Sequence, residues 1–141
     1  MLFRSTALDL SGKNLGADGA MVVCRYIHTN GALASLNVSS NNMASKDTGK
    51  AMAEALAQNT VLKELDVSAN LDMTSDGFSV RSGDGPGFAQ ELAVGLKNNR
   101  ALVKFDISDN IIGAEGCKAL AGALKYNTNI KELNIAGNYV S

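Results

Sequence analysis

The chain of 141 residues contains few of the residues that carry metal chemistry or covalent cross-links. It has one histidine, His28, and two cysteines, Cys24 and Cys117. A single histidine leaves no histidine pair for a metal site or for acid–base catalysis, and we expect no metal and no cofactor. Disulfide-stabilised domains use denser, paired cysteines, so we expect a cytoplasmic or otherwise intracellular, reducing setting.

Strong net charge and long apolar runs are also missing. The formal net charge of −1 gives no general attraction to nucleic acid or to an anionic membrane. No stretch approaches the roughly 18 apolar residues of a membrane-spanning helix, and residues 1–5 lack the apolar core of a secretion signal. The length suits one domain, so we expect a single domain over residues 1–141.

One short motif, in which two apolar residues alternate with Asp or Asn and then Ser or Ala, occurs five times. Its copies are Leu8–Ser11, Leu36–Ser39, Leu65–Ser68, Phe105–Ser108 and Leu133–Ala136. Their first residues lie 28 or 29 positions apart, except for one interval of 40. A period of this size is typical of a solenoid, in which each unit buries its apolar face against its neighbours.

The second repeat shows how one unit is built. Leu36 and Val38 alternate with Asn37 and Ser39, which is the period of a strand with one buried face. Asn41 then ends the strand. Asparagine recurs at the same place in three later repeats, as Asn70, Asn110 and Asn138. Because an amide both donates and accepts, we expect these asparagines to satisfy backbone groups of the turns.

A helix is predicted after each turn, because apolar residues recur four positions apart. The pairs are Val23 and Ile27, Met52 and Leu56, Leu92 and Leu96, and Leu120 and Leu124. A further asparagine follows each helix and is expected to close it in the left-handed conformation. These residues are Asn30, Asn59, Asn99 and Asn127. Since parallel strands pack about 4.8 Å apart and helices about 10 Å apart, the stacked units must curve, with strands on the concave face.

These motifs resemble the leucine-rich repeat family, in its ribonuclease-inhibitor-like class. The resemblance recurs five times over roughly residues 5 to 141 and is clearest in Leu36-x-Val38-x-x-Asn41-x-Met43 and Ile107-x-x-Asn110-x-Ile112-Gly113. It implies an α/β solenoid, a curved horseshoe segment with parallel strands on the concave face and helices on the convex face. It also implies a non-catalytic protein-interaction module. The alternatives are a regulator of a small GTPase, resembling a GTPase-activating protein, and a structural spacer within a larger repeat protein.

The third repeat is longer than its neighbours because of an insertion at about residues 72–85. The stretch from Leu71 to Gly87, which includes this insertion, contains the only proline of the chain, Pro86, and is rich in glycine, which predicts a loop. One interpretation is a tolerated surface insertion, and the other is a recognition loop in which Phe78, Val80 and Arg81 contact a partner. A calcium site is a weaker third alternative, because the spacing of its acidic residues does not match a known calcium loop. The residues concerned are Asp72, Asp76 and Asp84.

The outward-facing strand residues form columns across the predicted sheet and give a polar, modestly acidic face. One interpretation is a solvated face whose side chains hydrogen-bond across strands. The other is a docking surface for an unidentified protein partner, with a basic or amide-rich segment as the expected ligand and weak, salt-sensitive binding. The candidate contacts are Asp9, Asn37, Glu64, Asp66, Lys104, Asp106 and Asn134.

The last predicted strand, residues 131–136, is followed by five residues without a further helix. Its outer edge is therefore open, and open edges favour pairing with another chain. Two expectations follow, namely that the chain belongs to a longer array, or that it forms a homodimer through this edge.

Overall fold

The computed structural model describes residues 6–73 and 80–138. In chain order the described elements are β1 (Ala7–Asp9), α1 (Gly16–Thr29), β2 (Ser35–Asn37), α2 (Lys46–Gln58), β3 (Glu64–Asp66), β4 (Asp72–Met73), β5 (Val80–Ser82), α3 (Gly85–Asn98), β6 (Lys104–Asp106), α4 (Gly113–Leu124) and β7 (Glu132–Asn134). Among these residues, no helix combines the length and the apolar character that crossing a membrane requires.

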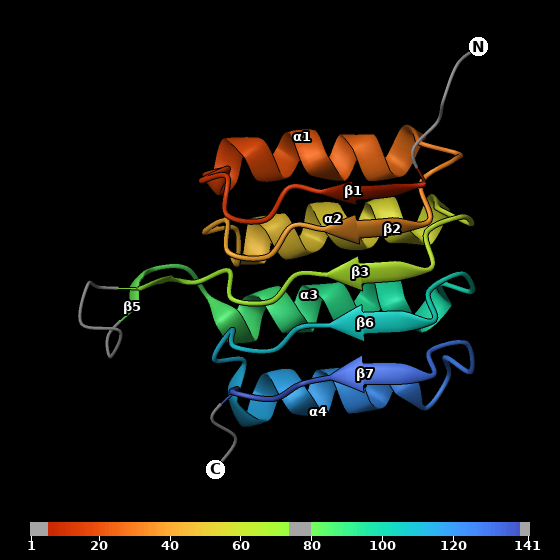
Figure 1. The fold of residues 1–141 in the computed structure, drawn as a ribbon. Coiled ribbons are helices and arrows are strands. Elements are labelled where there is room, and N and C mark those ends of the chain that lie inside the picture. Colours follow the sequence, from red (N-terminus) through yellow and green to blue (C-terminus); the bar gives the residue numbers. More distant parts are fainter. Residues whose placement is uncertain (1–5, 74–79, 139–141) are drawn as a thin grey trace.

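The five repeated motifs lie side by side in one parallel sheet, in the order β1-β2-β3-β6-β7 within the described residues (Figure 1). The register matches the repeats residue by residue. Leu36 of β2 pairs with Leu8 on one side and with Leu65 on the other, and Phe105 of β6 pairs with Leu65 and Leu133. The parallel ribbon predicted from the repeat spacing is confirmed.

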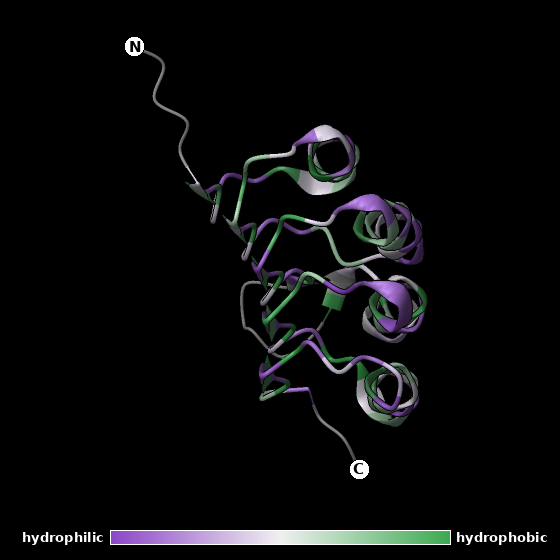
Figure 2. Cartoon of the chain, turned by 90° about the vertical axis from the view of Figure 1, so that its right-hand side faces the viewer, coloured by the Kyte–Doolittle hydropathy of each residue, from purple (hydrophilic) through white to green (hydrophobic). Residues whose placement is uncertain are grey.

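The helices form a second layer that covers one face of this sheet, as Figure 2 shows in a view along the helix axes. The core lies between the two layers, where the inward strand residues meet the apolar stripe of each helix. All members of the predicted stripe are buried except Leu124, near the end of α4, which is half-buried. The predicted α/β solenoid is confirmed.

The asparagines that end the strands form a buried ladder. The Asn110 side-chain oxygen accepts the backbone N–H of Asn70 at 2.7 Å, and its amide nitrogen donates to the carbonyls of Val67, Ile107 and Ser108 at 3.0, 3.1 and 3.2 Å. Asn41 and Asn70 make equivalent contacts to the coils before them. The expected role in satisfying turn backbone groups is confirmed, and the bonds from Asn110 to Asn70 and Val67 also join two coils.

Three of the second set of asparagines, Asn30, Asn59 and Asn99, close α1, α2 and α3, whereas α4 is closed by Lys125, and the predicted left-handed conformation is wrong. Asn59 is extended, with φ −81° and ψ 126°, and Asn30 and Asn99 are also extended. The Asn59 amide nitrogen donates to the carbonyl of Ile27 at 2.8 Å, and its oxygen accepts the N–H of Leu62 at 2.7 Å. The side chain needs this extended backbone because it must reach into the preceding coil.

The segment between β3 and α3 contains a second, two-stranded antiparallel sheet formed by β4 and β5. Figure 1 shows β5 beyond the C-terminal ends of the parallel strands. The base of this hairpin is held tightly, since a Cβ on Gly83 would lie 2.7 Å from Leu71 Cδ2 and 2.8 Å from the Ala44 carbonyl oxygen. Asp84 N donates to that same carbonyl at 2.8 Å, and the Asp84 side chain caps α3.

Candidate functional site

The face of the sheet opposite the helices forms a shallow groove of about 530 Å³, which we call the concave groove. Its lining comes from four neighbouring strands and comprises Ser35, Leu36, Asn37, Glu64, Leu65, Asp66, Lys104, Phe105, Asp106, Glu132, Leu133 and Asn134. The leucines and the phenylalanine form its floor because they point into the core, and the polar side chains project from it.

The concave groove brings six of the candidate residues together, namely Asn37, Glu64, Asp66, Lys104, Asp106 and Asn134. Asp9 lies in β1 beside Asn37 and is not part of the groove lining. Arg81 lies in β5, away from these strands, and Phe78 lies outside the described residues. Ser35 and Glu132 were not among the predicted contacts, although both stand in the same row of register partners as Glu64 and Lys104.

The Asp and Asn side chains of the central column each close the turn that follows their own strand. Asp66 Oδ1 accepts the backbone N–H of Ser68 at 2.9 Å, and Asp106 Oδ1 accepts that of Ser108 at 2.9 Å. Asn37 makes the same bond to Ser39, also at 2.9 Å. Because an amide oxygen serves this turn as well as a carboxylate does, the turn does not require the charge at Asp66 or Asp106.

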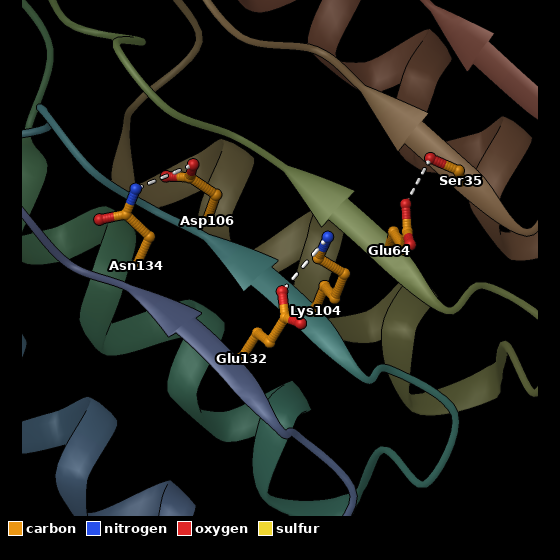
Figure 3. A network of polar contacts seen from close by, with 6 residues as sticks. All are labelled: Ser35, Glu64, Lys104, Asp106, Glu132 and Asn134. Carbon is orange, nitrogen blue, oxygen red and sulfur yellow. Dashed lines mark hydrogen bonds and ion pairs between the residues drawn. The ribbon is translucent and has the colours of Figure 1, made fainter.

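Three polar contacts cross between neighbouring strands on this face (Figure 3). Ser35 Oγ donates to Glu64 Oε2 at 3.2 Å, and Asn134 Nδ2 donates to Asp106 Oδ2 at 3.2 Å. Lys104 Nζ forms an ion pair with Glu132 Oε2 at 3.2 Å, with side chains 50% and 67% exposed. The hydrogen bond to Glu132, then the charges of Glu132 and Glu64, hold the pKa of Lys104 above its ordinary value.

The charge on this face is strongly unbalanced. Five carboxylates project from the strands, at Asp9, Glu64, Asp66, Asp106 and Glu132, and Lys104 is the one cation that these described strands contribute. The Ser11 hydroxyl and the Ser11 backbone N–H, which donate to Asp9, lower the pKa of that carboxyl below its ordinary value, so it stays ionised at neutral pH. The face is therefore suited to binding positive charge.

The residues most often associated with chemistry lie elsewhere. His28 is exposed on α1. Cys24 and Cys117 are free thiols, and burial raises the pKa of the Cys24 thiol to about 12, which keeps it protonated and unreactive at neutral pH. Of the three calcium candidates, Asp76 lies outside the described residues. Among residues 6–73 and 80–138, no group of three or more acidic, histidine or cysteine side chains could hold a metal ion.

Comparisons with known proteins agree with this architecture. A family model described as "Leucine Rich repeat" matches residues 98–121. The human protein "NACHT, LRR and PYD domains-containing protein 13" is 28% identical over 134 residues, a match that covers 94% of this chain and 12% of the relative. The chain therefore spans about 12% of the length of that curated relative.

A solved structure of leiomodin-1 actin-binding site 2 shares the fold. It has a TM-score of 0.73 and 16% sequence identity, covering 92% of this chain and 69% of that one. At this identity the likeness concerns the fold alone. Leucine-rich-repeat domains are typically non-catalytic and bind other proteins. The repeated strand–turn–helix units, the strand register and these matches together show that the chain has the fold of a leucine-rich repeat protein.

Proposed function

We propose that this chain is a single, non-catalytic, intracellular protein-binding domain whose concave groove holds a basic, extended segment of a partner protein. The observation that carries the proposal is the excess of carboxylates on the outward residues of the described parallel strands, where Lys104 is the one cation. Free cysteines agree with the intracellular setting.

The arrangement of Asp66 and Asp106 favours a cation as the ligand. The two residues are direct register partners on β3 and β6, so their side chains project side by side. Like charges directly opposite each other on neighbouring strands repel and destabilise a sheet. A guanidinium or ammonium group placed over this pair would remove the repulsion, which makes binding of positive charge favourable.

The shape of the groove favours an extended segment. The groove is open and spans four strands, and polar side chains project from an apolar floor of core-facing residues. Such a face has no deep pocket for an aromatic anchor, so electrostatic attraction supplies much of the specificity and of the association rate. Because these charges are exposed to solvent, binding should weaken as the salt concentration rises.

The double variant Asp66→Asn, Asp106→Asn tests the charge directly. Asparagine already closes the same turn in β2 and β7, through Asn37 and Asn134, so the fold should be unchanged. We expect the Kd for an arginine-rich peptide to rise by about three- to tenfold at low salt, because each exposed charge pair contributes modestly. Fluorescence anisotropy with a labelled peptide at several salt concentrations measures this change.

The matched control is Asp18→Asn, Asp47→Asn, which removes the same net charge from the first turns of α1 and α2. This control should leave peptide affinity nearly unchanged. If both double variants weaken binding equally, the effect comes from net charge and the concave groove is not the binding site. If the wild-type chain binds no basic peptide, the proposal is wrong.

Lys104 is expected to weaken the binding of a basic peptide to the groove. It already forms an ion pair with Glu132 and interacts electrostatically with Glu64, so these two carboxylates attract a second cation less strongly. Lys104→Met should therefore strengthen binding of the arginine-rich peptide by about two- to fivefold. The pair is exposed, so the midpoint of urea denaturation should barely move. Lys50→Met, on the exposed side of α2, removes the same charge and should have little effect on affinity. Equal gains in both variants would contradict a local role for Lys104.

Regulation of a small GTPase and a purely structural role stay predictions. Measuring GTP hydrolysis by a panel of small GTPases with and without the chain tests the first, and unchanged rates would contradict it. The solved leiomodin fragment is described as an actin-binding site, so binding of this chain to actin should be measured as well. If the chain binds no basic peptide, no small GTPase and no actin, this result would favour the role of a structural spacer.

Association of two copies through the β7 edge also stays a prediction. Ile135, next to β7, is 41% exposed, whereas Val38, Val67 and Ile107 at the same repeat position are fully buried. A second copy that covered this edge would remove that apolar surface from water. Light scattering over a concentration series measures the mass, and a monomer at every concentration would contradict the homodimer.

A further inference from the structure

A second, smaller hollow lies beyond the concave groove, at the base of the β4–β5 hairpin. This hollow, the apolar notch, has a volume of about 180 Å³ and is lined by Ala69, Leu71, Met73, Asp109, Ile111 and Gly137. Leu71 and Met73 come from the hairpin base, and the other four come from the turns after β3, β6 and β7. These are three of the strands that line the concave groove, so both hollows are built on the same coils.

Ile111 is an unexpected residue at its position in the notch. Its φ is +50°, in the left-handed region, which β-branched residues rarely adopt. The corresponding residues of the first two repeats are Asn14 and Asn42, with φ of 54° and 56°, and asparagine tolerates this conformation well. The fourth repeat therefore keeps an unfavourable isoleucine where an asparagine would fit. Backbone strain of this kind is concentrated at functional sites.

The distance between the notch and the carboxylates of the groove, together with the charges around the notch, indicates what would occupy it. Ala69, Asp109 and Gly137 each follow the last residue of their strand by three positions, so the notch begins on the order of 10 Å beyond the carboxylates of the groove. Asp109 is exposed at its margin and extends the acidic surface from Asp66 and Asp106 to the notch. An extended partner segment that places basic residues over the groove would bring a side chain about three residues away to the notch.

We propose that the apolar notch binds one aliphatic side chain of the same partner segment, so that the segment is recognised by two features, basic residues and an aliphatic residue about three positions from them. The inference rests on the proposed function of the concave groove and adds the chemistry of the partner. The groove supplies the electrostatic attraction, and the notch supplies apolar contact that salt does not weaken.

The test compares two blocked peptide libraries that bind to the intact chain. In the first, a leucine stands three residues before or after a pair of arginines, and in the second a serine replaces that leucine. The wild-type chain should bind the leucine library about tenfold more tightly, and this difference should persist at high salt. In Ile111→Asn the preference should disappear, while the urea midpoint stays equal or rises because the left-handed strain is relieved.

Val94→Asn is the matched control, because it removes an exposed aliphatic side chain from the convex side of α3 and should keep the preference for leucine. Met73→Ser, on the opposite wall of the notch, should lose that preference and provides a second variant if Ile111→Asn fails to fold. Equal binding of both libraries by the wild-type chain would contradict the proposal for the apolar notch but not the proposal for the concave groove. Failure of both libraries to bind would overturn the two proposals together.

Discussion

Replacing Asn110 by alanine is expected to lower the free energy of unfolding by about 3–5 kcal/mol. The side chain is fully buried and forms four hydrogen bonds with backbone groups of two coils. Truncation leaves the N–H of Asn70 and the carbonyl of Val67 buried without this partner, and each unsatisfied group costs about 1–3 kcal/mol. A domain of this size is typically stable by about 5–15 kcal/mol, so the loss is a large part of the total.

Urea denaturation followed by circular dichroism measures this change. Asn98→Ala, at an exposed position in the last turn of α3, is the control and should stay within about 0.5 kcal/mol of the wild type. Asn110→Asp provides a further comparison, since it keeps the oxygen that accepts from Asn70 but loses the amide donor. If Asn110→Ala unfolds at the same urea concentration as Asn98→Ala, the ladder does not stabilise the fold.

Gly95→Ala is expected to destabilise the chain by about 2 kcal/mol, although alanine is the better helix former. Gly95 lies on α3 where that helix approaches α2, and a Cβ there would lie 2.5 Å from the carbonyl oxygen of Ala53 and 2.6 Å from its Cα. These are backbone atoms, so the two helices must move apart. The corresponding residues of α2 and α4 are Ala55 and Ala123, where the chain accommodates a methyl group.

Gly122→Ala is the matched control on α4, because a Cβ at this position would meet no atom within 4 Å. At this position only the higher helix propensity of alanine over glycine acts, so the free energy of unfolding should rise by about 0.5–1 kcal/mol. The same substitution should thus change stability in opposite directions at two helical glycines, by a difference of about 3 kcal/mol. Thermal melting of both variants measures it, and a stabilised Gly95→Ala would show that α2 and α3 are not in close contact.

The sheet was predictable because two independent periods agree. Alternation within Leu36–Ser39 defines the buried face of one strand, and the repeat spacing aligns that strand with its neighbours. The columns of outward-facing residues followed from the same register, in which Glu64 pairs with Lys104 and Lys104 with Glu132. No further information was needed, since stacked coils repeat one geometry.

The details that were missed depend on contacts between coils or on backbone geometry. The helix-closing asparagines were expected to be left-handed, but Asn59 is extended because its amide binds the carbonyl of Ile27 in another coil. Side chains such as Asp66 were predicted only as outward contacts, and their hydrogen bond to the turn depends on the exact path of the chain after β3. The notch at Ile111 was missed because its other wall, Met73, belongs to the hairpin, whose fold no repeat predicts.

The strand-ending asparagines give the solenoid a direction. The backbone N–H of Asn41 bonds to the side chain of Asn70, that of Asn70 to Asn110, and that of Asn110 to Asn138. The turns at Asn41, Asn70 and Asn110 thus each rely on a side-chain oxygen that the following turn supplies. Fraying that begins at the carboxyl-terminal coil consequently exposes an amide proton in the coil before it, and solvent exchange should advance from there toward the amino terminus.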